Sequence, residues 1–134
     1  MKFIEWTKEL SVKVKEIDDQ HKNLINLINR AHALSEKKSP KEDLNSLLDE
    51  VIEFTRIHFS TEEKYFEKFD YPGKEEHEEE HIKLIQKVLK FKTKQEKGQD
   101  ITHDLLEFLK DWLKDHLMKM DMKYVDFFQE CGLK

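Results

Sequence analysis

The strongest constraint on the fold is a helical repeat of apolar residues that continues through four long segments of the chain. In the second segment, for example, Leu44, Leu48 and Val51 recur at the intervals that place side chains on one face of an α-helix. The chain contains only 3 Gly and 2 Pro, which are too few for the turns of a many-stranded β protein. Gly73 and Gly98 fall between segments and separate them. The sequence therefore predicts an all-α protein.

The segments predict helices at about residues 18–37, 40–70, 74–96 and 101–129, after an extended N-terminal arm at 1–17 that packs on the domain. Short connections force neighbouring helices to run antiparallel. With 134 residues, the chain has the length of one domain, residues 1–134. We therefore expect an antiparallel up-down-up-down four-helix bundle, with Asp18 as the N-cap of the first helix.

Composition excludes several classes of partner. The formal net charge of −5 argues against nucleic acid and against an anionic membrane, because both require a basic surface. No apolar run approaches the roughly 20 residues that cross a bilayer, and the N-terminus is charged too early for a secretory signal. Cys131 is the single cysteine, which favours a reducing compartment. We expect a cytoplasmic protein that is a monomer.

Ionisable residues occupy positions where the helical stripes should be apolar. His58 and Glu62 are four residues apart and lie on the face of the second helix that carries Val51. His77 and His81 repeat this spacing on the third helix. A buried His or Glu without a partner costs several kcal/mol, so these groups need a common compensating partner.

The heights of these groups along the bundle allow them to meet. Reflection of each helix through its turn places His21 within a turn of His58, and places His77 and His81 level with the region of His116 and Asp121. Across the connection between the second and third helices, the expected height of the His58–Glu62 pair agrees with that of the His77–His81 pair to within about one helical turn. Seven side chains from four helices therefore converge on one layer: His21, His58, Glu62, His77, His81, His116 and Asp121.

Five imidazoles and two carboxylates in one layer indicate a metal site, with too many ligands for a single ion. Two ions that share the carboxylates as bridges would use all seven groups. Ligand type alone leaves iron, zinc, copper and nickel open. A site of this kind can exchange electrons with little change of net charge, which suits dioxygen. The alternative is a plain bundle whose core histidines are hydrogen-bonded one by one.

One spacing conflicts with a regular helix. His116 and Asp121 are five residues apart, so an α-helix would turn their side chains about 140° away from each other. We therefore predict that the backbone departs from α geometry between these two residues, through a bulge or a helix end.

The ligand residues, in this order, resemble the hemerythrin family, and the single-domain length is similar to that of its bacterial members. The matching motifs are Ile17–His21, His58–Glu63, His77–His81, and His116 followed by Asp121. Each pair alone is a weak signal, but all seven positions in order are a specific one. The resemblance covers essentially the whole chain.

The resemblance implies two non-haem iron ions with unequal sets of histidine ligands. One ion would be held by His77, His81 and His116, and the other by His21 and His58. The two ions would be bridged by Glu62, by Asp121 and by an oxo or hydroxo group. The ion with two histidines would keep an open position for dioxygen.

The family's pocket positions also have counterparts in this sequence. The resemblance implies that an apolar wall surrounds the open position, formed by Leu24, Phe59, Trp112 and Leu117. Such a wall would exclude water and protons, and would thereby slow the loss of bound oxygen as peroxide, which would leave an inert, oxidised site.

These features favour reversible dioxygen binding, for oxygen storage or for delivery to oxygen-requiring enzymes. No candidate nucleophile or general acid accompanies the metal layer, so we expect a carrier and not an enzyme. The histidine-rich ligand set also differs from the Glu-x-x-His sets of ferritin-like bundles. The alternatives are a di-iron oxidase or peroxidase, a nitric-oxide-handling enzyme, and a sensor of oxygen or iron.

Overall fold

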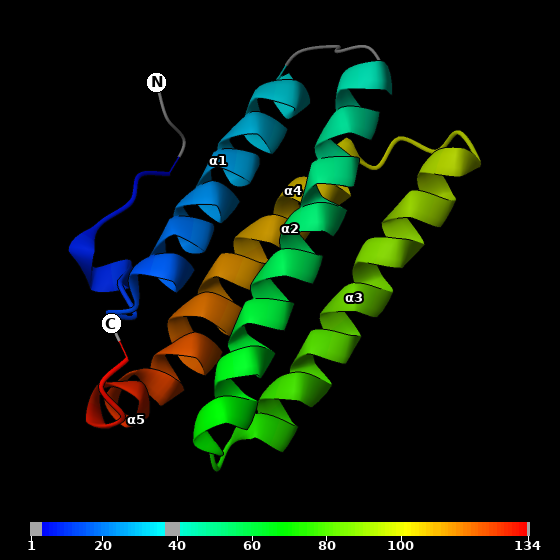
Figure 1. The fold of residues 1–134 in the computed structure, drawn as a ribbon. Coiled ribbons are helices and arrows are strands. Elements are labelled where there is room, and N and C mark those ends of the chain that lie inside the picture. The colour runs from blue at the N-terminus through cyan, green and yellow to red at the C-terminus, as the bar shows by residue number, and fades with distance from the viewer. Residues whose placement is uncertain (1–3, 37–40, 134) are drawn as a thin grey trace.

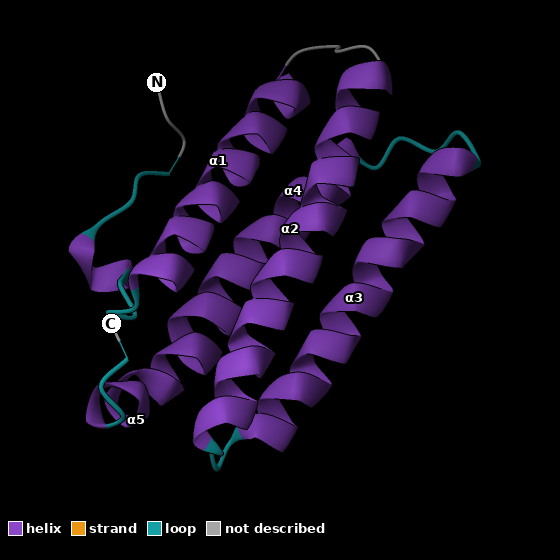
Figure 2. Cartoon of the chain, in the orientation of Figure 1, coloured by secondary structure: helices purple, strands orange, loops and turns teal. Residues whose placement is uncertain are grey.

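The computed structural model describes residues 4–36 and 41–133, which form helices and loops but no strand (Figure 2). Four long helical rods lie side by side (Figure 1). Three of the rods are single helices, namely α1 (Lys15–Glu36), α2 (Lys41–Phe69) and α3 (Lys74–Glu96). The predicted all-α four-helix bundle is thereby confirmed. None of the helices in the described part of the chain is long and apolar enough to cross a membrane.

The fourth rod changes its helical form along its length. It consists of α4 (Thr102–Asp111), the π-helical segment η2 (Trp112–Met120), the 3-10 segment η3 (Asp121–Tyr124) and α5 (Val125–Glu130). At the end of η2, the Asp121 N–H donates to the carbonyl oxygen of His116, five residues earlier. This bond widens the turn, so that residues five apart lie on one face. The predicted departure from α geometry is confirmed.

The N-terminal region is more structured than an extended arm. It contains the 3-10 turn η1 (Lys8–Leu10), and α1 begins at Lys15, three residues before the expected start. Asp18 consequently lies inside α1 and is not its N-cap. Its carboxylate accepts hydrogen bonds from the Ser11 hydroxyl at 2.5 Å and from the Val12 N–H at 2.8 Å, so it fastens the arm to the helix. The expected boundaries at residues 37 and 40 lie outside the described residues.

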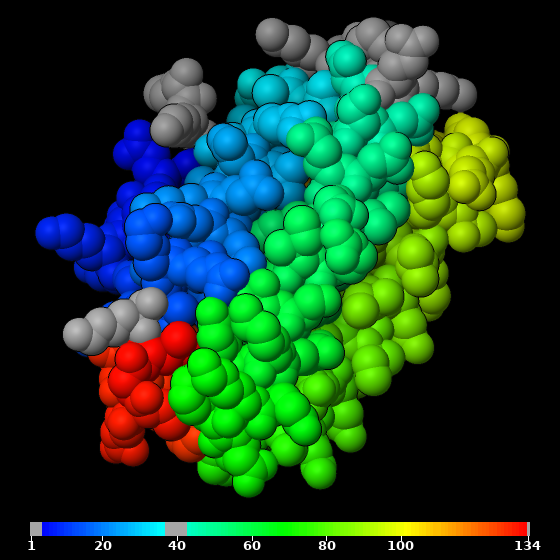
Figure 3. Space-filling model, in the orientation of Figure 1, coloured from blue at the N-terminus to red at the C-terminus, as the bar shows by residue number. Residues whose placement is uncertain are grey.

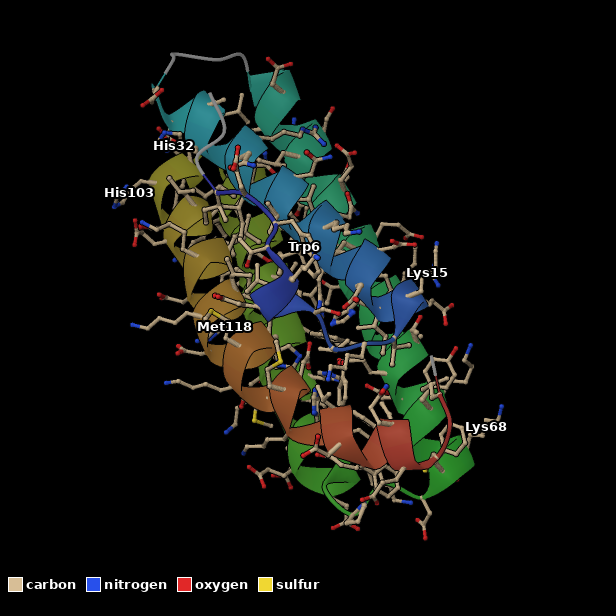
Figure 4. All side chains as sticks on the ribbon, turned by 90° about the vertical axis from the view of Figure 1, so that its left-hand side faces the viewer. Trp6, Lys15, His32, Lys68, His103 and Met118 are labelled. Carbon is tan, nitrogen blue, oxygen red and sulfur yellow. The ribbon has the colours of Figure 1, made fainter. Side chains whose placement is uncertain are left out.

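The arm lies across the bundle and is held at a second point. The Asn29 side chain accepts from the Ile4 N–H at 2.8 Å and donates to the Ile4 carbonyl at 2.9 Å. Trp6 lies on the outer surface of the rods, where it packs against the core and beneath the Lys22 ammonium (Figure 4). The arm therefore covers apolar surface that the helices would otherwise expose.

Two apolar clusters form the core. The larger cluster fills the bundle between the rods and includes Leu24, Phe59 and Leu117. The smaller cluster lies near the α2–α3 turn and the C-terminal segment, and includes Phe66 and Tyr124. The layer of ionisable side chains described below contacts both clusters, so it is sealed by apolar side chains on two sides.

We predict that Asp18→Ala lowers the free energy of unfolding of the apo-protein by about 1–2 kcal/mol, because two hydrogen bonds to the arm are lost. Urea unfolding followed by circular dichroism measures the change. Asp19→Ala serves as the control, since Asp19 forms only exposed pairs with Lys15 and Lys22. Equal midpoints for the two variants would contradict this role of Asp18.

Candidate metal centre

All four rods contribute to one buried layer of ionisable side chains. His21 comes from α1, and the other six residues come in pairs from the remaining rods: His58 and Glu62 from α2, His77 and His81 from α3, and His116 and Asp121 from η2 and η3. Each of the seven residues is at most 1% exposed. The structure thus brings together every candidate ligand residue that the sequence singled out.

The seven side chains form two groups, and each group is compact enough to surround one ion. One group consists of Glu62, His77, His81 and His116, and the other of His21, His58, Glu62 and Asp121. Within each group the potential ligand atoms lie within 4.8 Å of one another. Glu62 belongs to both groups, which is the position that a bridging ligand requires.

The two carboxylates differ in how their oxygen atoms face the two groups. Asp121 directs Oδ2 towards His21, 2.9 Å from its Nε2, and Oδ1 towards His77 and His116, 2.9 and 3.1 Å from their Nε2 atoms. Asp121 therefore presents one oxygen to each group. Glu62 instead presents Oε1 to both groups, 2.9 Å from His81 Nε2 and 3.3 Å from His58 Nε2.

Several polar atoms in this layer have no hydrogen-bond partner. They include Nε2 of His77, Nε2 of His116 and Oδ1 of Asp121, which are close to one another but not aligned as donor and acceptor. Unsatisfied buried polar atoms are rare because each carries a desolvation penalty. A cation placed among them would satisfy these lone pairs, so the donor set fits metal ions.

The carboxylates and imidazoles shift each other's pKa values. Burial opposes protonation of His77 and His116, but the carboxylates of Asp121 and Glu62 outweigh it, raising the pKa of His77 to about 9 and that of His116 to about 10. At His21, burial dominates and lowers the pKa. Burial also opposes ionisation of Glu62 and Asp121, but the surrounding imidazoles hold the pKa of each carboxyl well below its usual range.

Two candidate ligand imidazoles are oriented by side chains that the sequence analysis did not identify. His58 Nδ1 lies 2.8 Å from Gln20 Oε1, and the Gln20 amide in turn donates to the Thr61 hydroxyl at 2.9 Å. His81 Nδ1 lies 2.8 Å from Glu63 Oε2. A hydrogen bond at Nδ1 orients a ring so that Nε2 is the metal-binding atom. Gln20 and Glu63 each adjoin a candidate ligand residue in sequence, but adjacency alone does not indicate which ring either side chain faces.

Tyr124 has a polar role that the sequence alone did not reveal. Its hydroxyl donates to Glu62 Oε2 at 2.5 Å, and its ring stacks on His77 at a centroid distance of 5.7 Å. Burial raises the pKa of this phenol well above its ordinary value, so the hydroxyl remains a donor. The bond explains why Glu62 presents only its other oxygen to the two groups.

The four predicted pocket residues, Leu24, Phe59, Trp112 and Leu117, are all buried in the larger apolar cluster. Phe59 stacks on the His81 ring at 3.8 Å and lies 5.8 Å from the His58 ring, so it contacts both groups. An additional residue, Phe54, stacks on His58 at 5.4 Å. Phe54 was missed because its spacing is that of an ordinary core position.

The remaining two of the chain's 7 histidines are not part of the layer. His32 and His103 lie near the end of the bundle where α1 ends and α4 begins, and they point outward (Figure 4). His103 is exposed, and His32 lies 3.2 Å from Glu36.

Comparisons with known proteins agree with this architecture. Residues 12–128 match the family model described as the hemerythrin HHE cation binding domain. The bacteriohemerythrin of Stenotrophomonas maltophilia is 29% identical over 94% of this chain and 82% of its own length. A hemerythrin-like protein of Naegleria gruberi is 36% identical over 66% of this chain and 68% of its own. A crystal structure of wild-type hemerythrin superposes with a TM-score of 0.85 at 28% identity, and covers 92% of this chain and 96% of that one.

We predict that binding of Zn²⁺ or Fe²⁺ to the apo-protein at pH 7 releases about two protons per chain, because His77 and His116 must become neutral to bind a metal. Calorimetry in buffers of different ionisation enthalpy measures the number. His103→Ala should not alter it. Binding without proton release would contradict the raised pKa values.

The same shifts predict how the stability of the apo-protein depends on pH. The pKa values of His77 and His116, at about 9 and 10, lie above the ordinary value near 6.5. Their stabilising contribution is therefore complete below about pH 6.5 and is lost as the pH rises through 9 to 10. Chemical unfolding of the apo-protein at a series of pH values should show this loss, and a stability that rises over that range would contradict it.

Glu63→Ala should weaken metal binding about tenfold, because the His81 ring loses the carboxylate that orients it. Glu63→Gln should restore much of the affinity, since an amide oxygen can accept the same hydrogen bond. Competition with a chromophoric chelator measures both values. Glu67→Ala is the matched control, because Glu67 is one turn further along α2 and its side chain is 85% exposed. Equal affinities for Glu63→Ala and the control would refute the orienting role.

Proposed function

This chain belongs to the hemerythrin family, and we propose that it binds dioxygen reversibly at a non-haem di-iron centre. Membership of this family supports a metal-binding protein of an oxygen-binding type. We further propose that the binding is reversible and that it serves oxygen storage or delivery to an oxygen-consuming enzyme. The single, exposed Cys131 suits a reducing compartment, and we assign the protein to the cytoplasm on that ground.

The proposed ligand sets follow the two groups of side chains. His77, His81 and His116 would hold one iron, and His21 and His58 the other, with Glu62 and Asp121 between them. Glu62 belongs to both groups, and Asp121 directs one carboxylate oxygen towards His21 and the other towards His77. Both observations support the bridging roles. Two iron ions in these positions would supply the electrons that reversible oxygen binding requires.

The observation that carries the proposal is the inequality of the two groups. One offers three imidazoles in addition to carboxylate oxygen, whereas the other offers only two. Metal sites that act on small molecules keep a position free of protein ligands, whereas closed sites are structural. The group with His21 and His58 is therefore the proposed binding position for dioxygen.

The surroundings of that position favour binding over turnover. Leu24, Leu117 and Phe54 are at most 4% exposed and belong to the apolar cluster that contacts the layer. Apolar walls exclude water and keep proton donors away from a bound ligand. Tyr124, the nearest hydroxyl donor to Glu62, is already engaged in its hydrogen bond. These features support a carrier and not an enzyme.

The test is a cycle of anaerobic reduction, exposure to air and removal of oxygen, followed in the visible spectrum. The proposal predicts a charge-transfer band that appears with oxygen and disappears when oxygen is removed. Irreversible bleaching, with continued consumption of reductant, would establish an oxidase or peroxidase instead. A reversible band with nitric oxide but not with oxygen would indicate the nitric-oxide-handling alternative.

We predict that Leu117→Asn accelerates autoxidation of the oxygenated protein about tenfold or more, because a buried amide admits water next to the binding position. Leu24→Asn should act in the same direction. Decay of the oxygenated spectrum measures the rate. Met118→Asn is the matched control, because Met118 is the next residue along η2 but is 50% exposed. An unchanged lifetime in both buried variants would refute the role of the apolar wall.

A further inference from the structure

Each of the two groups of candidate ligands contains an imidazole whose Nδ1 faces a side-chain oxygen outside the group. In the three-histidine group, His81 Nδ1 lies 2.8 Å from Glu63 Oε2. In the two-histidine group, His58 Nδ1 lies 2.8 Å from Gln20 Oε1. The distances are equal, but the first acceptor is a carboxylate and the second is an amide. The two groups therefore differ in the charge directly behind one of their rings.

The orientation of the Gln20 amide is fixed by a chain of hydrogen bonds. The Thr61 hydroxyl donates to the Ile57 carbonyl at 2.9 Å, so its lone pairs remain to accept from the Gln20 amide N–H at 2.9 Å. The amide oxygen is consequently the atom that faces His58. The acceptor behind the His58 ring is therefore a neutral carbonyl oxygen, held in place at both ends of the amide.

The Glu63 carboxylate has no cationic neighbour to cancel its charge. No lysine or arginine in the described parts of the chain forms an ion pair with it, and its one ion-pair partner there is the His81 ring. α2 and α3 meet at the surface of the face shown in Figure 3, and the Glu63 side chain on α2 is 39% exposed. Water can therefore solvate the carboxylate while Oε2 remains directed at the ring.

A hydrogen bond at Nδ1 affects more than the orientation of a ring. When Nε2 binds a metal ion, Nδ1 carries the ring proton and donates it to the oxygen behind the ring. A carboxylate attracts this proton more strongly than an amide does, because the hydrogen bond is charge-assisted. The ring then becomes a more basic ligand. A more basic ligand favours Fe³⁺ over Fe²⁺, so it lowers the reduction potential of the ion that it binds.

We propose that Glu63, acting through His81, lowers the reduction potential of the ion in the three-histidine group, and that Gln20 leaves the ion in the two-histidine group without this shift. Glu63 thereby directs the first oxidation of the reduced centre, the loss of one electron from Fe²⁺ to give Fe³⁺, to the three-histidine group. The ion at the proposed binding position for dioxygen stays Fe²⁺, which can still give an electron to dioxygen. The inference rests on the proposed di-iron centre and adds an electronic difference between its two ions.

An anaerobic redox titration of the iron-loaded chain, with mediators as electron acceptors, tests the effect of the charge. Glu63→Gln keeps an oxygen acceptor at His81 but removes the charge, so the first oxidation step should shift towards Fe²⁺ about tenfold, which is about 59 mV for one electron. Glu67→Gln is the matched control, because it removes the same charge one turn further along α2, where the side chain is 85% exposed. Circular dichroism and the count of bound iron establish that each variant is folded and loaded. Equal first potentials in Glu63→Gln and the control would overturn the proposal.

Moving the charge from one group to the other tests its position. The double variant Glu63→Gln with Gln20→Glu has the net charge of the wild type but places the carboxylate behind His58. Proton and nitrogen-15 NMR of the Zn²⁺-loaded chain observes the Nδ1–H groups without iron or oxygen. The His81 Nδ1 proton should lie further downfield than that of His58 in the wild type, and the order should reverse in the double variant. The same order in both proteins would overturn the proposal.

These measurements separate the inference from the proposed function. A chain that binds two iron ions but no dioxygen would contradict the proposed function, and the potentials and Nδ1 signals would still decide the inference. Reversible oxygen binding, with one first potential shared by the wild type and Glu63→Gln, would contradict the inference alone. A chain that binds no metal ion would overturn both.

Discussion

The rest of the structure depends on the burial of two carboxylates among five imidazoles. Glu62 and Asp121 are fully buried, and each lies within 3.6 Å of at least three of the rings. Burial of so many ionisable groups is unfavourable unless the charges compensate each other or a cation is added. Because the groups come from all four rods, that compensation also holds the rods in one register. The apolar clusters on both sides of the layer keep water from replacing it.

A π-helical segment in the fourth rod is needed to bring both His116 and Asp121 into this layer. A regular helix would carry Asp121 away from His116, whereas the bond from the Asp121 N–H to the His116 carbonyl keeps both side chains on the inner face. π-helical turns are rare and are found mostly at functional sites. The irregular backbone therefore serves to position the side chains of the candidate metal centre, and the packing of the bundle does not require it.

Much of this could be predicted from the sequence, because helical periodicity and ligand spacing are local properties. The four rods, the seven layer residues and the irregular backbone before Asp121 all follow from intervals along the chain. Gln20, Glu63 and Tyr124 could not be predicted, since their roles depend on which side chain of another helix they face. The start of α1 was misplaced because Asp18 resembles an N-cap, although its carboxylate is instead bonded to the arm. The roles of these side chains and the start of α1 depend on tertiary contacts, which a local sequence pattern does not reveal.

The central claim is that Glu62 and Asp121 are shared between two metal ions. The most direct measurement is an anaerobic titration of the apo-protein with Fe²⁺, in which the bound iron per chain is counted for the wild type and for Asp121→Ala. The account predicts two ions per chain in the wild type, and loss of tight binding of at least one of them in the variant. A single ion in the wild type, or two equally tight ions without the Asp121 carboxylate, would contradict it.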